Sequence, residues 1–179
     1  IVKAYPRGEM PRQAHTKMHG LLEAEFEVLP NLPQHLQEGI FKEPKTYKAY
    51  IRFSNASRGL KPDTKKDIRG IGIKVFGVEG MKLMDFYPTE QDFVCISHDV
   101  FVAKNVEKFS KTLKAIGKGK LGLALYMLNP MHFGVLKRVI GSMRKIDHLL
   151  NTTFYSTTPY QFGSPDKAVK YAVVPVSTH

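Results

Sequence analysis

An unbroken alternation of apolar and polar side chains over residues 47–54 constrains the fold of this chain more than any other stretch. In an extended strand, successive side chains point to opposite faces of the sheet. One face therefore carries the apolar set Tyr47, Ala49, Ile51 and Phe53. The opposite face carries Arg52 and Ser54 side by side, which predicts a half-buried strand with a polar pocket wall.

Strand and helix patterns elsewhere place the chain in the α+β class. Strand-like runs occupy residues 21–29, 71–77, 82–87, 92–97 and 167–176. Apolar residues at helical spacing predict a helix over 102–116, and a longer helical region over 121–150 that Pro130 interrupts. A short helix is expected over 34–42. We therefore predict an antiparallel sheet of five or six strands, followed by helices and one last strand.

At 179 residues the chain has the size of one domain with a substantial core. The patterns divide it into an N-terminal arm at 1–20, strands at 21–101, helices at 102–150, and a turn-rich connector with the final strand at 151–179. The first residue is isoleucine, so we expect either a processed N-terminus or a longer polypeptide.

Cysteine usage and hydropathy limit the cellular setting. A single cysteine, Cys95, excludes an internal disulfide and a cysteine-based metal cage, and its apolar neighbours predict a buried thiol. Six of the seven histidines, His19 among them, lack metal-ligand spacing with any partner. No apolar run reaches the roughly 18 residues that span a bilayer, and the first residues lack a signal-peptide pattern. We expect a cytoplasmic or periplasmic protein, with the cytoplasm favoured.

The formal net charge of +11 bears on the partners of the chain. Such a charge suits a nucleic-acid or anionic-membrane surface, and it would also attract an anionic cofactor or substrate. The lysines are spread along the chain, which favours an ordinary solvated basic surface. No nucleic-acid recognition motif is present, so no specific nucleic-acid partner is expected.

Three short motifs follow one another in the first part of the chain. They are Arg12-x-x-His15-x-Lys17, Arg52-Phe53-Ser54 and Asp67-x-Arg69-Gly70-x-x-x-Lys74. In this order and at these separations, with Phe93 and Phe101 behind them, they resemble the haem catalases, and most of all the small catalase-related, peroxidase-like proteins. The resemblance is specific over residues 10–102 and vaguer over 103–179. Asp67 and Arg69 themselves are expected to form a structural turn with a local ion pair.

The resemblance implies a catalase-type antiparallel β-barrel, or part of one, that binds haem b and consumes hydrogen peroxide or organic hydroperoxides in oxidative stress. His15 would take a proton from the peroxide and return it to the leaving oxygen. Ser54 would orient the imidazole, and Arg12 and Arg52 would bind the haem propionates. The aromatic residues that would line the pocket are Phe93 and Phe101.

The chain departs from the family pattern in two places. Catalases have Asn-Asn-Thr where this chain has residues 88–92, so Gln91 is the candidate amide that orients peroxide. The family's axial tyrosine belongs to an Arg-x-x-x-Tyr motif, and no arginine here precedes a tyrosine by four residues. Three explanations stay open. A C-terminal half lies beyond these residues, two chains complete one sheet as a homodimer, or a truncated catalase-like module without haem serves as a binding or structural protein.

Overall fold

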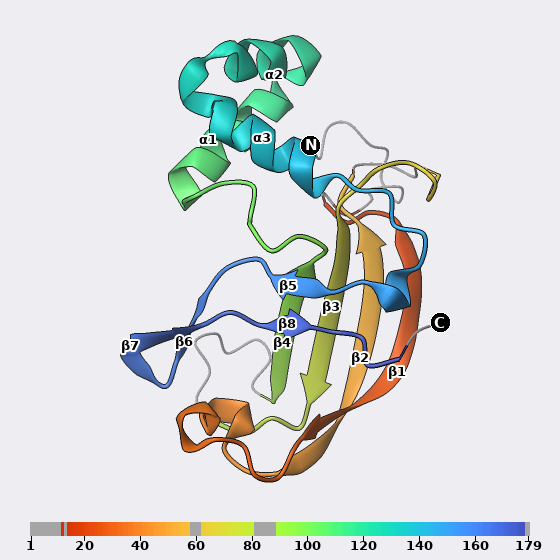
Figure 1. Cartoon of the computed structure of the whole chain (residues 1–179), viewed down its shortest axis with the longest axis vertical. Coiled ribbons are helices and arrows are strands. Elements are labelled where there is room, and N and C mark those ends of the chain that lie inside the picture. The colour runs from red at the N-terminus through yellow and green to blue at the C-terminus, as the bar shows by residue number, and fades with distance from the viewer. Residues whose placement is uncertain (1–11, 13, 58–61, 81–88, 178–179) are drawn as a thin grey trace.

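The computed structural model of the chain describes residues 12, 14–57, 62–80 and 89–177. Six strands form an antiparallel sheet that curls into a half-barrel, and three helices stand at one end of it (Figure 1). In sheet order the strands are β1 (Met18–Val28), β2 (Lys45–Asn55), β3 (Arg69–Phe76), β4 (Glu90–Ile96), β5 (Phe154–Ser156) and β8 (Ala172–Val173). Two more strands, β6 (Tyr160–Phe162) and β7 (Ser164–Val169), pair with each other. The predicted α+β class and partial barrel are confirmed.

The register of β2, β3 and β4 determines which side chains share a face of the sheet. Ser54 pairs with Gly70, which pairs with Ile96 near one end of these strands. Ala49, Val75 and Gln91 form the corresponding row near the other end. The two rows are five positions apart along each strand. Because side chains alternate between the faces and five is an odd number, the rows belong to opposite faces.

The inner face of the half-barrel carries the core, in two clusters. The first contains Ala49, Val75, Val78 and Phe93, with Phe26, Phe41 and Tyr171 packed against it. The second contains Phe53, Ile71, Cys95 and Phe154, so β5 covers the sheet at this point. Burial raises the pKa of the Cys95 thiol to about 11, which makes it unreactive near neutral pH. The predicted alternation on β2 and the predicted buried thiol are both confirmed.

Three predicted boundaries were wrong. β1 begins at Met18, inside the predicted arm, because Met18 already pairs with Ser54. The expected helix at 34–42 is two separate 3-10 turns, η2 (Gln34–Leu36) and η3 (Gly39–Phe41), and Gly39, the first residue of η3, has a φ of +56°. The expected last strand is divided into β7 and β8. The possible strand at 82–87 lies outside the described residues.

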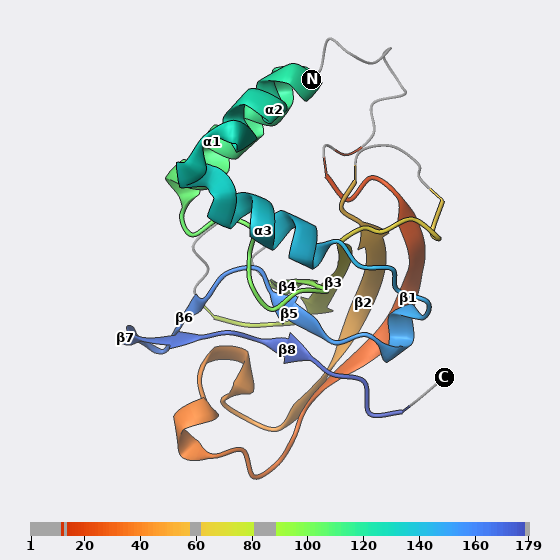
Figure 2. The same cartoon turned by 45° about the horizontal axis from the view of Figure 1, so that its top comes forward.

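The helical region follows the predicted pattern. Asn105 caps the N-terminus of α1 (Val106–Gly117), because its side chain accepts a hydrogen bond from the Lys108 backbone N–H. α2 (Gly119–Leu128) ends before the 3-10 turn η4 (Pro130–His132), and α3 (Phe133–Ser142) follows. Figure 2 shows α1 and α2 as a hairpin that projects from the sheet, with α3 returning toward it. Within the described residues, no helix is long and apolar enough to cross a membrane.

Candidate functional site

The His15 side chain lies against the outer face of the sheet, where β2 and β3 meet. Its Nδ1 is 2.9 Å from the hydroxyl of Ser54, a residue only 3% exposed. Which of the two atoms donates depends on the imidazole tautomer. Among the described residues Nε2 has no hydrogen-bond partner, so this nitrogen is available for proton transfer. The two residues predicted to act together are therefore in contact.

Gly70 allows the imidazole to lie on the sheet. A Cβ at residue 70 would be 2.4 Å from Cε1 of His15, 2.5 Å from its Nδ1 and 3.2 Å from the Ser54 hydroxyl. Any side chain there would occupy the space of the ring. The glycine that follows Arg69 in the third motif thus makes room for the histidine of the first. The sequence indicated a turn at this position and gave no signal of this contact.

Arg52 holds the backbone of His15 in an unusual conformation. His15 has a φ of +53°, in the left-handed region that non-glycine residues seldom adopt. The Nη2 of Arg52 donates to the His15 carbonyl oxygen at 2.7 Å. Burial and then the positive charge of Arg12 lower the pKa of the Arg52 guanidinium. An anion bound between the two arginines would relieve this repulsion.

The surroundings favour the neutral form of the imidazole. Burial lowers the pKa of His15 below its ordinary value of 6.5, and the charge of Arg52 lowers it further, while Asp67 acts in the opposite direction. His15 is therefore mainly uncharged at neutral pH, which suits a group that first accepts a proton and then returns it.

We expect the His15 ring to titrate below pH 6.5, as measured by NMR of its Cε1–H proton. An Arg52→Met variant should raise this pKa because it removes a positive charge, and a Lys48→Met variant on the same strand should leave it unchanged. Since the folded-state pKa is depressed, the contribution of this residue to stability is full above about pH 6.5 and decreases as the pH falls toward the folded-state pKa. A pKa at or above 6.5 in the unmodified chain would contradict the described environment.

A buried polar network supports the site from the inner side. Arg69 is 1% exposed, and it donates to the Asn55 side-chain oxygen at 2.5 Å and to the Asp63 carbonyl at 2.7 Å. The Nε2 of His19 is 2.5 Å from the same Asn55 oxygen. Sequence reasoning missed Asn55 and His19, because only the β1–β2 pairing brings them together.

The expected ion pair between Asp67 and Arg69 is not formed in the described part of the chain. The Arg69 guanidinium donates to Asn55 instead, and the Asp67 carboxylate accepts hydrogen bonds from the backbone N–H groups of Ser57 and Ile68. Lys74, at the end of the third motif, forms ion pairs with acidic residues of β4, which agrees with a structural role.

The other predicted site residues lie away from His15. Gln91 and Phe93 point to the inner face of β4, opposite to Ser54, and line a separate cavity of about 330 Å³. Phe101 follows β4 and packs against Phe109 of α1, with ring centroids 5.1 Å apart. The structure therefore groups His15 with Ser54 and Arg52, with Arg12 nearby, and it does not bring the amide or the aromatic residues to them.

The assembled site can transfer a proton through a neutral imidazole beside two cations. No group of three or more histidine, cysteine, aspartate or glutamate side chains among the described residues could hold a metal ion.

The chain matches no protein-family model, and searches of curated proteins and of solved structures also found no match.

Proposed function

We propose that this chain is a haem-binding, peroxide-consuming protein of the catalase-related type, with His15 as its proton carrier. The observation that carries the proposal is the His15–Ser54 contact of 2.9 Å over Gly70. All three residues come from the motifs that resemble the haem catalases, and they lie far apart in the sequence. The curled antiparallel half-barrel agrees with part of a catalase-like barrel.

The residues present fit one side of a haem group. The imidazole is oriented, half-buried and uncharged near neutral pH, and Nε2 has no partner among the described residues. The guanidinium groups of Arg12 and Arg52, the first of which lowers the pKa of the second, suit carboxylate groups such as propionates. The ion pairs found among the described residues involve neither arginine.

Haem, when bound, would supply the two-electron chemistry of peroxide reduction. His15 would accept the proton of the hydroperoxide at Nε2 and return it to the oxygen that leaves as water or alcohol. Ser54 would hold the ring in one orientation throughout, and Arg52 would fix the backbone that carries the ring. The reductant that supplies the two electrons would be an organic donor, or a second peroxide that is oxidised to oxygen.

A second candidate is a catalase-like module that binds no haem. The missing Arg-x-x-x-Tyr motif favours it, because the axial ligand of catalase haem is a tyrosine. Under the first proposal the axial tyrosine would come from a second chain or from residues outside the 179 of this sequence.

Titration of the chain with ferric haem separates the two candidates. We expect a shifted Soret band that saturates at one haem per chain, or at one per two chains if a homodimer forms the site. His15→Gln should alter the spectrum, whereas His35→Gln, an exposed position on η2, should leave it unchanged. A spectrum identical to that of free haem at every ratio would favour the haem-free module.

A further inference from the structure

The positive charge of the chain is concentrated in its helical region. Residues 102–150 contain ten of the 27 basic residues but only two of the 16 acidic ones, a net +8 out of +11. Basic residues occur along the whole chain, as the sequence indicated, and the uneven charge comes both from an excess of basic residues and from a shortage of acidic residues in the helical region. The helices in Figure 1 that project from the sheet are therefore its most basic part.

α2 has an apolar face that is open to solvent. Its members lie at positions i, i+3, i+4 and i+7 and are Leu121, Ala124, Leu125 and Leu128. The three leucines are 73%, 62% and 71% exposed. Met131, in the following 3-10 turn, is 81% exposed. Gly122 faces α1 instead, since a Cβ there would be 3.2 Å from the carbonyl oxygen of Ala115. We call the three leucines and Met131 the leucine face.

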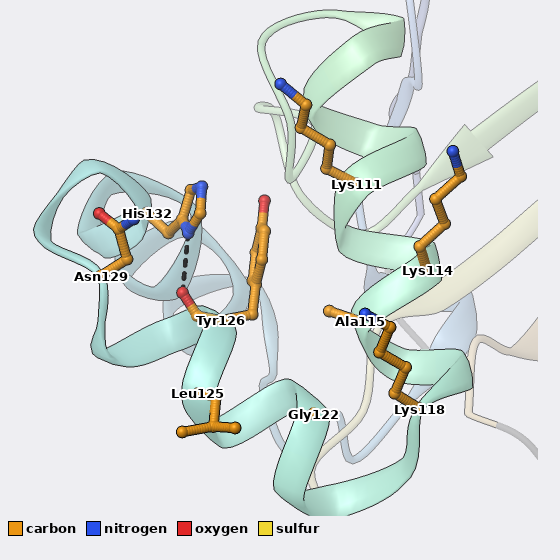
Figure 3. Close-up of a pocket in the computed structure, with 9 residues that line it drawn as sticks. All are labelled: Lys111, Lys114, Ala115, Lys118, Gly122, Leu125, Tyr126, Asn129 and His132. Carbon is orange, nitrogen blue, oxygen red and sulfur yellow. Dashed lines mark hydrogen bonds between the residues drawn. The ribbon is translucent and has the colours of Figure 1, made fainter.

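A basic cavity adjoins the leucine face. It lies between α1 and α2, has a volume of about 490 Å³, and is lined by lysines at positions 111, 114 and 118 together with Leu125, Tyr126 and His132 (Figure 3). The rings of Tyr126 and His132 stack with centroids 3.7 Å apart, which makes one wall rigid. Lys111 is paired with Glu107 at 2.6 Å. The ion pairs within the described residues do not include Lys114 or Lys118, so these two ammonium groups can meet an external anion.

We propose that the α1–α2 hairpin docks this protein on the surface of an anionic lipid bilayer. The leucine face would enter the boundary between headgroups and acyl chains, and Lys114 and Lys118 would bind lipid phosphates at the basic cavity. Interfacial anchors combine exposed apolar side chains with neighbouring lysines. Here the leucines come from α2, and the lysines come from α1 and the residue that links the two helices. Each lysine near an anionic membrane adds to the attraction. This inference is independent of the proposed haem chemistry.

Charge complementarity favours a membrane over a second copy of the chain. Two copies meeting symmetrically through α2 would bring like charges together, because the same basic cavity borders the leucine face on each. An anionic bilayer would instead bury the leucines among its acyl chains and place its negatively charged headgroups beside the lysines. The leucine face and the basic cavity would then both have a complementary partner.

The test is flotation of the 179-residue chain with lipid vesicles. We expect binding to vesicles of phosphatidylcholine with about one-third phosphatidylglycerol, little binding to pure phosphatidylcholine, and weaker binding as salt increases. The double variant Lys114→Glu/Lys118→Glu should weaken binding about 30-fold or more. The control Lys42→Glu/Lys167→Glu makes the same change in net charge at exposed residues outside the helices, and it should bind within about threefold of the unmodified chain.

A second variant tests the leucine face. Leu121→Asp/Leu125→Asp should reduce vesicle binding at least tenfold without unfolding the chain, because both side chains already face solvent. Equal binding to neutral and anionic vesicles, or unchanged binding by either helix variant, would overturn the proposal. Light scattering measures the molar mass of the chain in solution and adds a second test. If the unmodified chain is a dimer, the leucine variant is a monomer and neither binds vesicles, a second copy of the chain covers the leucine face and the proposal is overturned.

Discussion

Replacing Arg69 with methionine is expected to lower the free energy of unfolding by about 3 kcal/mol. This is the typical cost when a buried charged donor is removed and its hydrogen-bond acceptors stay buried. The guanidinium is almost fully buried, and its donors satisfy the Asn55 side chain and the Asp63 carbonyl. Methionine fills much of the same volume but donates nothing. The Asn55 side-chain oxygen would keep only the contact with His19, and the Asp63 carbonyl would lose the hydrogen bond from Arg69.

Urea unfolding of the variant and the unmodified chain measures this difference, provided that both show the same m-value. Lys66→Met is the matched control, because Lys66 is an exposed cation three residues earlier and its loss should change the stability by less than about 0.5 kcal/mol. An Arg69 variant within 1 kcal/mol of the unmodified chain would show that the network contributes little to the fold. His15 would then owe its position to Ser54, Arg52 and Gly70 alone.

The sheet was largely predictable from sequence because its signal is local. Alternation over residues 47–54 identified both the strand and its buried face, and Ala49 and Phe53 are buried as expected. The boundaries were harder, since pairing decides them: β1 extends back to Met18 only because β2 offers Ser54 as a partner. A local pattern cannot contain that information.

The site was predictable only in part, for a related reason. The resemblance of the motifs to those of the haem catalases pointed to His15 and Ser54, and the structure brings them together. Gln91 and Phe93 were assigned to the same site, yet the register of β4 turns both to the inner face. The sequence shows that the side chains of a strand alternate between two faces. The relative register of β2, β3 and β4 determines which residues of β4 share the face that His15 contacts, and the sequence pattern does not contain that register.

Replacing Gly70 with alanine is expected to displace the His15 ring, since the new methyl carbon would lie 2.4 Å from Cε1 of the imidazole. The ring belongs to a side chain that can rotate away, so the free energy of unfolding should change by only about 1 kcal/mol. A displaced ring should also be less buried, which should let the His15 pKa rise toward its ordinary value. In the haem-loaded protein, peroxide turnover should fall about 100-fold, the lower end of what general acid–base catalysis contributes.

Gly72→Ala is the matched control for the structural part of this prediction. Gly72 lies two residues along the same strand on the same face, and a Cβ there meets no atom within 4 Å. The His15 NMR signal and its pKa should therefore be unchanged in Gly72→Ala and clearly altered in Gly70→Ala. If both variants keep the His15 signal of the unmodified chain, the imidazole does not lie on Gly70 and the proposed site loses its basis. If Gly70→Ala moves the ring but leaves turnover intact, His15 is not the proton carrier. The described geometry of the site would then be correct, and its proposed chemistry would be wrong.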